Sequence, residues 1–155
     1  MLKYVNADIV FQEIPDEVTL AVNISNCPCH CPGCHSSYLW QDIGTPLTSE
    51  VLDEFMSHYG SDITCLCFMG GDASPKEVES LARYMHTHHG EKRVAWYSGR
   101  IRIPEQVDTS AFDYIKVGPY IKHLGCLKDR TTNQRLYKHV ANGELQDITS
   151  YFWRK

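Results

Sequence analysis

Residues 63–75, ITCLCFMGGDASP, join an apolar run to two glycines, an aspartate and the start of a helix. An apolar run without polar alternation is typical of a strand that is buried on both faces of a parallel sheet. Ser74 and Pro75 are residue types that begin helices, and Gly90 is the type that ends one. The stretch therefore predicts a strand, a tight turn and a helix that stops before Gly90, which is one unit of an α/β fold.

Similar units lie on both sides of this stretch. The other predicted elements are a strand at 19–24 (TLAVNI), a helix at 48–59 (TSEVLDEFMSHY), and strands at 93–99 (RVAWYSG) and 113–121 (DYIKVGPYI). Thr48 or Ser49 caps the first helix and Gly60 ends it. Strands that alternate with helices indicate parallel pairing through right-handed crossovers. Four or so units fall well short of the roughly 250 residues of a closed eight-fold barrel, so we expect an open, partial (βα) barrel.

The two ends of the chain have a different pattern. Residues 4–25 alternate apolar and polar residues around a Pro-Asp turn, which predicts an N-terminal strand pair. Residues 133–149 place Asn142-Gly143 between two alternating segments, which predicts a C-terminal hairpin. The expected architecture is thus a single α/β domain over residues 1–155, with a strand pair before the partial barrel and a hairpin extension after it.

Composition and charge narrow the class of protein. The chain has 155 residues, 43% of them apolar and 22% charged, and a formal net charge of −4 without a run of Lys or Arg. This argues against nucleic acid as a partner. Neither a signal-peptide pattern nor a run of eighteen apolar residues is present, so we expect a cytoplasmic protein that does not bind a membrane.

Seven cysteines are an odd number, and four of them lie in Cys27–Cys34. Close spacing of this kind disfavours disulfides and indicates metal ligands or catalytic thiols. Four thiolates could hold one zinc ion. An iron–sulfur cluster suits ligands from one short loop better, because it is several ångströms across. Cys27, Cys31 and Cys34 form C-x₃-C-x₂-C, and whether Cys29 is a fourth ligand stays open.

This C-x₃-C-x₂-C pattern after a strand resembles the radical S-adenosylmethionine (SAM) enzymes. The resemblance implies a 4Fe–4S cluster on Cys27, Cys31 and Cys34, with SAM on the remaining iron, and a partial barrel of the type expected above. It also implies that Gly70-Gly71-Asp72 corresponds to the Gly-Gly-Glu-like motif that binds the SAM amino group, with a shorter acid here.

The chain is most similar to the activating proteins of anaerobic (class III) ribonucleoside-triphosphate reductases. CPCHCPGCHSSYLW (27–40), MGGDASP (69–75) and DRTTNQRLY (129–137) carry this resemblance. It implies an oxidoreductase in which a flavodoxin-like protein reduces the cluster, SAM is cleaved to a 5′-deoxyadenosyl radical, and a glycine of the reductase catalytic subunit becomes a glycyl radical.

Further candidate site residues follow from position. Gly33 stands where many radical SAM enzymes have an aromatic residue near the adenine, so the Gly33 backbone or His35 would take that role. Tyr97 and Ser98 end the third predicted strand and are candidate SAM contacts. Lys116 stands in a strand where some activases have a cation-binding aspartate, so we expect no such cation site. Cys65 and Cys67 are expected to be small core residues.

Two other functions fit the same residues. One is activation of another glycyl-radical enzyme, or a small radical SAM synthase. The other, from a different class, is a non-catalytic iron–sulfur or zinc module for electron transfer.

Overall fold

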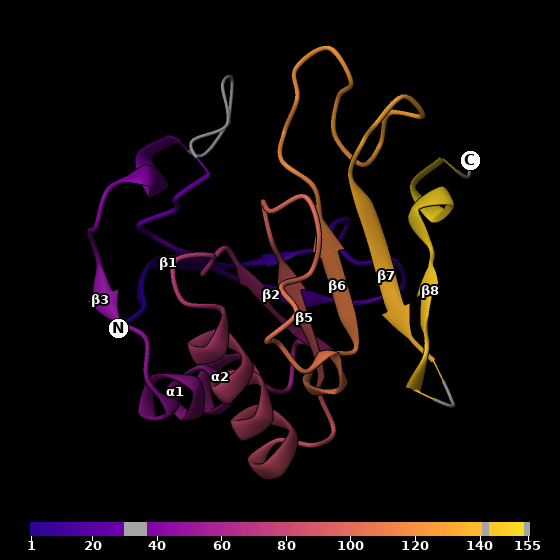
Figure 1. Cartoon of the computed structure of the whole chain (residues 1–155). Helices are drawn as coiled ribbons and strands as arrows, with labels where there is room; N and C mark the ends of the chain where they lie inside the picture. Colours follow the sequence, from indigo (N-terminus) through magenta and orange to yellow (C-terminus); the bar gives the residue numbers. More distant parts are fainter. Residues whose placement is uncertain (30–36, 141–142, 154–155) are drawn as a thin grey trace.

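The structure, a computed structural model, describes residues 1–29, 37–140 and 143–153. Within these residues the chain forms one eight-stranded sheet, two α-helices and short 3-10 turns (Figure 1). The strands are β1 (Lys3–Val10), β2 (Thr19–Ile24), β3 (Thr45–Pro46), β4 (Cys65–Met69), β5 (Arg93–Tyr97), β6 (Tyr114–Val117), β7 (Arg135–His139) and β8 (Leu145–Asp147). The helices are α1 (Ser49–Tyr59) and α2 (Pro75–His88), and the 3-10 turns are η1 (Ser37–Trp40), η2 (Thr109–Ala111) and η4 (Thr149–Trp153).

The sheet has a parallel centre and antiparallel flanks. Its strand order is β3-β1-β2-β4-β5-β6-β7-β8. β2, β4, β5 and β6 pair in parallel, in the order in which they occur along the chain. β1 and β3 extend one side by antiparallel pairing, and β7 and β8 extend the other. The sheet twists strongly, so that β1 runs across the direction of β6 and β7 (Figure 1).

The expected partial barrel of the radical SAM type is wrong. A (βα) barrel places a helix after each parallel strand, and the strands close around a common axis. Here only α1 and α2 cover the sheet, and the connection from β5 to β6 contains no more than η2 among the described residues. The antiparallel strands at both ends widen the sheet into an open, mixed one. The N-terminal strand pair and the pairing of β7 with β8 are nevertheless present, as edges of this single sheet.

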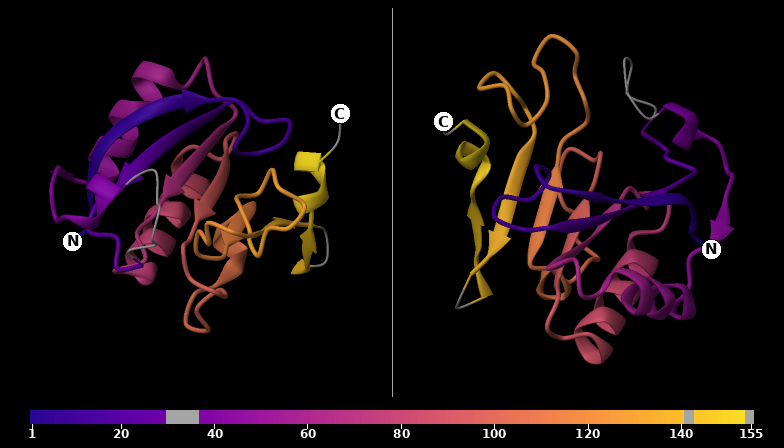
Figure 2. Two further views of the ribbon diagram at one scale, coloured as in Figure 1. Left: turned by 90° about the horizontal axis from the view of Figure 1, so that it is seen from above. Right: turned by 180° about the vertical axis from the view of Figure 1, so that it is seen from behind.

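Each face of the sheet has its own apolar cluster. Alternate residues of the central strands, among them Leu66, Phe68 and Trp96, pack toward α1 and α2. The intervening residues, among them Cys65 and Cys67, form a smaller cluster on the opposite face. Figure 2 shows the two helices together on one side of the sheet and the C-terminal segment at its other end. Burial on both faces explains why the central strands are continuous apolar runs.

The helices begin and end where their residue types indicate. The Thr48 hydroxyl accepts a hydrogen bond from the Val51 amide, at 3.4 Å, and Gly60 caps the end of α1. Pro75 occupies the first turn of α2, where a missing N–H has no cost. Neither α-helix of the described residues has the length and apolar character needed to cross a bilayer.

Candidate functional site

The carboxyl ends of the four parallel strands meet at one edge of the sheet, which is where α/β folds bind ligands. The cysteine loop follows β2 directly. Its base is closed by two backbone hydrogen bonds, from the Asn26 amide to the Gln41 carbonyl at 2.8 Å and from the Cys27 amide to the Leu39 carbonyl at 2.9 Å. Both Cys27 and Cys29 are half-buried. The cysteine loop is therefore fixed to the edge at its start and at its end.

Asp72 links the loops that follow β2, β4 and β5. Its side chain is 1% exposed, and its two oxygens accept hydrogen bonds from the Ser98 hydroxyl at 2.6 Å and the Gly99 amide at 2.8 Å. The Cys29 thiol lies 3.7 Å from Asp72 Oδ2. A buried carboxylate is stable only when such donors replace water. Asp72 thus holds the segment after β5 against the start of the cysteine loop.

Arg100 supplies the cation nearest to this carboxylate. Its guanidinium donates to the Asp72 backbone carbonyl at 2.5 Å, and its Nε lies 3.9 Å from Asp72 Oδ1. The Arg100 side chain is 44% exposed, so it stands between the buried acid and solvent. The acid and the cation together stabilise the turn at Gly70–Asp72 against the segment after β5.

Three glycines leave the space in which these groups meet. Gly70 and Gly71 have φ angles of 111° and 89°, which are left-handed conformations that side chains rarely adopt. A Cβ on Gly71 would lie 2.4 Å from Val78 Cγ2 in α2. A Cβ on Gly99 would lie 2.9 Å from Cys29 Sγ. Glycine at position 99 is therefore what lets the thiol approach the end of β5.

The donor set fits an iron–sulfur cluster. Ligand atoms of Cys27, Cys29 and Asp72 all lie within 4.8 Å of one another. Thiolates are the ligands that hold such clusters, and the absence of a side chain at Gly99 leaves room for the Cys29 sulfur. The predicted ligands Cys31 and Cys34 lie outside the described residues, as do the candidate SAM contacts Gly33 and His35.

Lys116 fixes the ends of β5 and β6. Its ammonium group donates to the Ser98 carbonyl at 3.2 Å and to the Gly118 carbonyl at 2.9 Å, and the side chain is buried. Its Nζ lies 5.7 Å from the centre of the Tyr97 ring. These two hydrogen bonds join the segments that follow β5 and β6.

The Asn133-Gln134-Arg135 segment packs against the same edge. The Asn133 amide donates to the Pro119 carbonyl at 3.1 Å, and Gln134 is 6% exposed with its amide 3.5 Å from the Gly118 carbonyl. A Cβ on Gly118 would lie 2.9 Å from Gln134 Cα, so glycine is required for this contact. The segment thus packs against the residues that follow β6.

The structure separates Tyr97 from Ser98. Ser98 is fully buried and hydrogen-bonded to Asp72, whereas the Tyr97 side chain belongs to the cluster on the sheet face opposite the helices. The Tyr97 hydroxyl donates to the Glu13 carbonyl. Of these two candidate SAM contacts, only Ser98 lies with Asp72 and Cys29.

The remaining described cysteines are of two kinds. Cys65 and Cys67 are fully buried, and burial raises the pKa of both thiols above the ordinary range. Cys126 is exposed. Buried, protonated thiols behave as small hydrophobic side chains, which is the role expected for both residues from the sequence.

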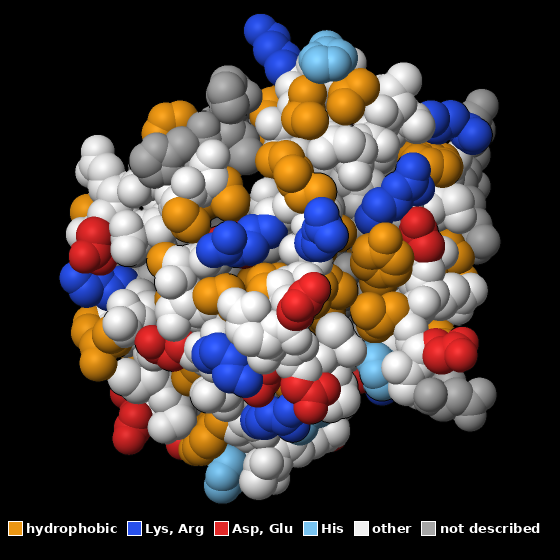
Figure 3. Space-filling view, viewed as in Figure 1, with side chains coloured by type: hydrophobic (Ala, Val, Ile, Leu, Met, Phe, Trp, Pro, Cys, Tyr) orange, Lys and Arg blue, Asp and Glu red, His pale blue; other side chains and the backbone are white. Residues whose placement is uncertain are grey.

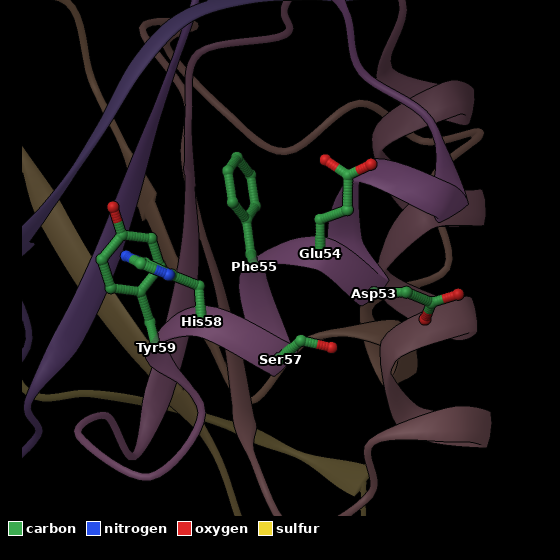
Figure 4. Close-up of a pocket in the computed structure, with 6 residues that line it drawn as sticks. All are labelled: Asp53, Glu54, Phe55, Ser57, His58 and Tyr59. Carbon is green, nitrogen blue, oxygen red and sulfur yellow. The ribbon is translucent and has the colours of Figure 1, made fainter.

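Two hollows differ in their relation to this site. A cavity of about 540 Å³ opens beside Cys29 and is lined by residues 99–102, Pro104, Gln106 and Pro119 as well as the thiol. A larger hollow of about 620 Å³ lies against α1 and is lined by Asp53, Glu54, Phe55, Ser57, His58 and Tyr59 (Figure 4). The hollow on α1 has no thiol and no glycine turn, so we assign the site to the cavity at Cys29.

Three residues of this site lack a distinctive sequence signal. Gly99 and Arg100 follow a strand without a recognisable motif, and Lys116 is a charged residue inside an apolar run. A lysine within an apolar run can indicate a buried cation that binds nearby carbonyls, because charged residues are almost never buried without partners. Asp72 was predicted as a ligand-binding acid. Its contacts with Ser98 and Gly99 were not predicted, because these residues lie 26 and 27 positions further along the chain.

The comparisons with known proteins agree with this donor set. A family model described as "4Fe-4S single cluster domain" matches residues 17–117, about two thirds of the chain. The match begins just before β2 and ends with β6, so it covers the whole parallel part of the sheet. No curated protein and no solved structure matches the chain. With its cysteine loop at the carboxyl edge of that parallel part, the chain belongs to the 4Fe-4S single cluster domain family.

Proposed function

We propose that the chain is a SAM-dependent, radical-generating oxidoreductase that activates the catalytic subunit of an anaerobic ribonucleoside-triphosphate reductase. One observation carries the proposal: the buried carboxylate of Asp72 lies 3.7 Å from the Cys29 thiol, with a glycine turn on one side and a cavity on the other. A site that only transfers electrons needs no cavity and no close backbone approach beside its cysteines.

Cys27, Cys31 and Cys34 would hold the cluster through their thiolates, and the amino and carboxylate groups of SAM would complete it. When bound and reduced by a flavodoxin-like protein, such a cluster would supply the electron for cleaving SAM to methionine and a 5′-deoxyadenosyl radical. The proposed outcome is a glycyl radical on the partner subunit.

The chain's own residues position and shield the reactants. The Gly70-Gly71 turn lets a ligand approach the backbone closely, because no side chain intervenes. Asp72 and Lys116 fix the segments after β4, β5 and β6, so the rim of the cavity is set before a ligand arrives. Such prior ordering lowers the entropy cost of bringing reactants together.

Anaerobic reconstitution with iron and sulfide tests the proposal. We expect a 4Fe–4S absorbance and electron paramagnetic resonance (EPR) signal that changes on addition of SAM, and release of 5′-deoxyadenosine after reduction. Cys29→Ala should keep cluster and product, whereas Cys27→Ala should lose both. Cys126→Ala is the matched control, because that thiol is exposed and does not line the cavity beside Cys29. An intact cluster that never changes its EPR signal with SAM would overturn the proposal.

A zinc module is the second candidate, because Cys27, Cys29 and Asp72 bring three ligand atoms within 4.8 Å. This candidate predicts zinc in the anaerobically purified protein and loss of that zinc in Cys29→Ala. The two candidates therefore make opposite predictions for the same variant.

The partner is tested separately. Mixing the reduced, SAM-loaded protein with the reductase catalytic subunit should give the doublet EPR signal of a glycyl radical. Cleavage of SAM without this signal, but with a signal on a different glycyl-radical enzyme, would reassign the partner. Cleavage without a glycyl radical on any such enzyme would favour a small radical SAM synthase.

A further inference from the structure

The cavity beside Cys29 has a basic rim. Arg100 and Arg102 both line it, and none of the other described lining residues is acidic. The nearest carboxylate, on Asp72, is 1% exposed and already accepts hydrogen bonds from Ser98 and Gly99. Glu105 is exposed in the same loop but does not line the cavity. A chain with a net charge of −4 thus concentrates positive charge at the opening of its site.

The two arginines differ in their existing partners. Arg100 is held by the Asp72 carbonyl and lies near its carboxylate. Arg102 is exposed, and among the described residues it has no ion-pair partner. Lys and Arg side chains gather across the middle of the molecular face in Figure 3. Arg102 can therefore bind an anion without giving up an ion pair with any other residue that the structure describes.

Ile101, between the two arginines, is 79% exposed. At this exposure Ile101 offers an apolar surface that a partner can cover, and arginine is enriched in protein interfaces. A small anionic metabolite would occupy the arginines and leave Ile101 in water, whereas a polypeptide covers both.

The loop that carries these residues is fixed at both ends. Near its start, the Gly118 amide donates to the Arg100 carbonyl at 2.6 Å. Near its end, the Lys76 ammonium group of α2 donates to the Gln106 carbonyl at 3.2 Å. A surface that is ordered before binding loses less entropy when a partner docks.

We propose that Arg102 and Ile101 form a docking surface for an acidic, extended segment of the partner polypeptide. The surface places that segment at the mouth of the cavity beside Cys29. The inference rests on the proposed function for the identity of the partner, but the surface itself is defined by charge and exposure. The partner segment would carry carboxylate side chains next to an apolar residue and would lie along the rim of the cavity.

The test uses the full-length, cluster-loaded protein and a fluorescein-labelled peptide, Glu-Glu-Leu-Gly-Leu-Glu, with binding followed by anisotropy. We expect Arg102→Glu to weaken binding by about tenfold or more, and Ile101→Ser by a smaller factor. Lys138→Glu is the matched control, because it makes the same charge change on an exposed residue of β7. Binding should weaken as salt is raised, since exposed charges are screened.

Three results would overturn the docking surface. One is equal binding of the peptide in which lysine replaces each glutamate. Another is an Arg102→Glu effect no larger than that of Lys138→Glu. The third is displacement of the peptide by sodium phosphate or free glutamate at the concentration of peptide that half-saturates the protein, which would assign the cavity to small anions.

Cleavage of SAM by the same samples separates this inference from the proposed function. Peptide binding with no 5′-deoxyadenosine from any sample would keep the docking surface and remove the proposed function. Cleavage that is equal in wild type and Arg102→Glu, together with the expected loss of peptide binding, supports both.

Discussion

Cys27 and Cys29 have the same side chain as Cys65 and Cys67 but lie in a different environment. The first pair lies in the loop that follows β2, half-buried, beside an acid and a cavity. The second pair lies within β4, fully buried in the smaller apolar cluster. Burial raises the pKa of the thiols in β4, which keeps them protonated and removes them from metal chemistry.

The comparison shows that the position of a cysteine in a parallel sheet determines its role. Inside a strand, a thiol faces neighbouring side chains and contributes packing. Just beyond the carboxyl end of a strand, it faces the loops of adjacent strands and a ligand. Both environments occur along β4 and the turn that follows it, because Cys67 lies inside the strand and Asp72 lies just past its end. A shift of a few residues along the chain separates a core position from a site position.

The largest expected effect is on cluster content. Replacing Cys27 with Ala should remove nearly all iron from the reconstituted protein, because one of three predicted thiolate ligands is lost. Replacing Cys67 with Ala should leave the iron content unchanged. Iron and sulfide analysis of the two variants, side by side, checks the contrast. Equal loss of iron in both would remove the distinction between the two pairs.

Asp72→Asn tests the contact between the two regions. The substitution removes a buried charge that accepts from Ser98 and Gly99, and we expect it to lower the free energy of unfolding by about 2–3 kcal/mol. Urea denaturation of the apo protein measures the effect. Ser98→Ala should cost less, and the double variant should cost less than the sum of the two. Strict additivity would show that the Asp72–Ser98 contact is not energetically coupled.

Cys67→Ser tests the buried pair. A hydroxyl at a fully buried position in the apolar cluster should cost about 1–3 kcal/mol, because its donor has no water to bind. Cys126→Ser is the control, and as an exposed change it should stay within about 0.5 kcal/mol. The same urea titration serves both. A Cys67→Ser protein as stable as wild type would mean that the site is wetter than its burial indicates.

The smallest expected effect is on the dependence of stability on pH. Burial raises the pKa of the β4 thiols above the ordinary value of about 8.5, so their contribution to stability is complete below that pH and declines as the pH rises through alkaline values. The double variant Cys65→Ala, Cys67→Ala should therefore lose less stability between pH 8 and pH 10 than wild type. Thermal unfolding across this range provides the measurement. Parallel curves for the two proteins would contradict it.

Much of the local structure follows from sequence pattern. The strand at 19–24 and the helix that Thr48 caps and Gly60 ends are found as predicted, because apolar period and capping residues act over a few positions. The positions of the cysteine loop and the glycine turn, each directly after a central strand, follow in the same way. The ligand roles of Cys27, Cys31 and Cys34 stay predictions, and the last two lie outside the described residues.

The overall shape of the sheet did not follow. Alternating strands and helices were compatible with a partial barrel, but β1, β3, β7 and β8 pair antiparallel at the two sides and leave the sheet open. Pairing between distant strands depends on hydrogen bonds and packing that a local pattern does not encode. The same limit applies to the SAM candidates, since one residue of register sends Tyr97 and Ser98 to different surroundings.

The sequence by itself predicted the central strands and both α-helices, showed where the thiols cluster, and made those thiols candidate metal ligands, because each of these depends on neighbours along the chain. Tertiary structure alone decided that Asp72 joins Ser98 to Cys29, that Lys116 clamps two strand ends, and that Arg102 and Ile101 stand at the mouth of the cavity. These contacts join segments that meet only when parallel strands bring their carboxyl ends to one edge.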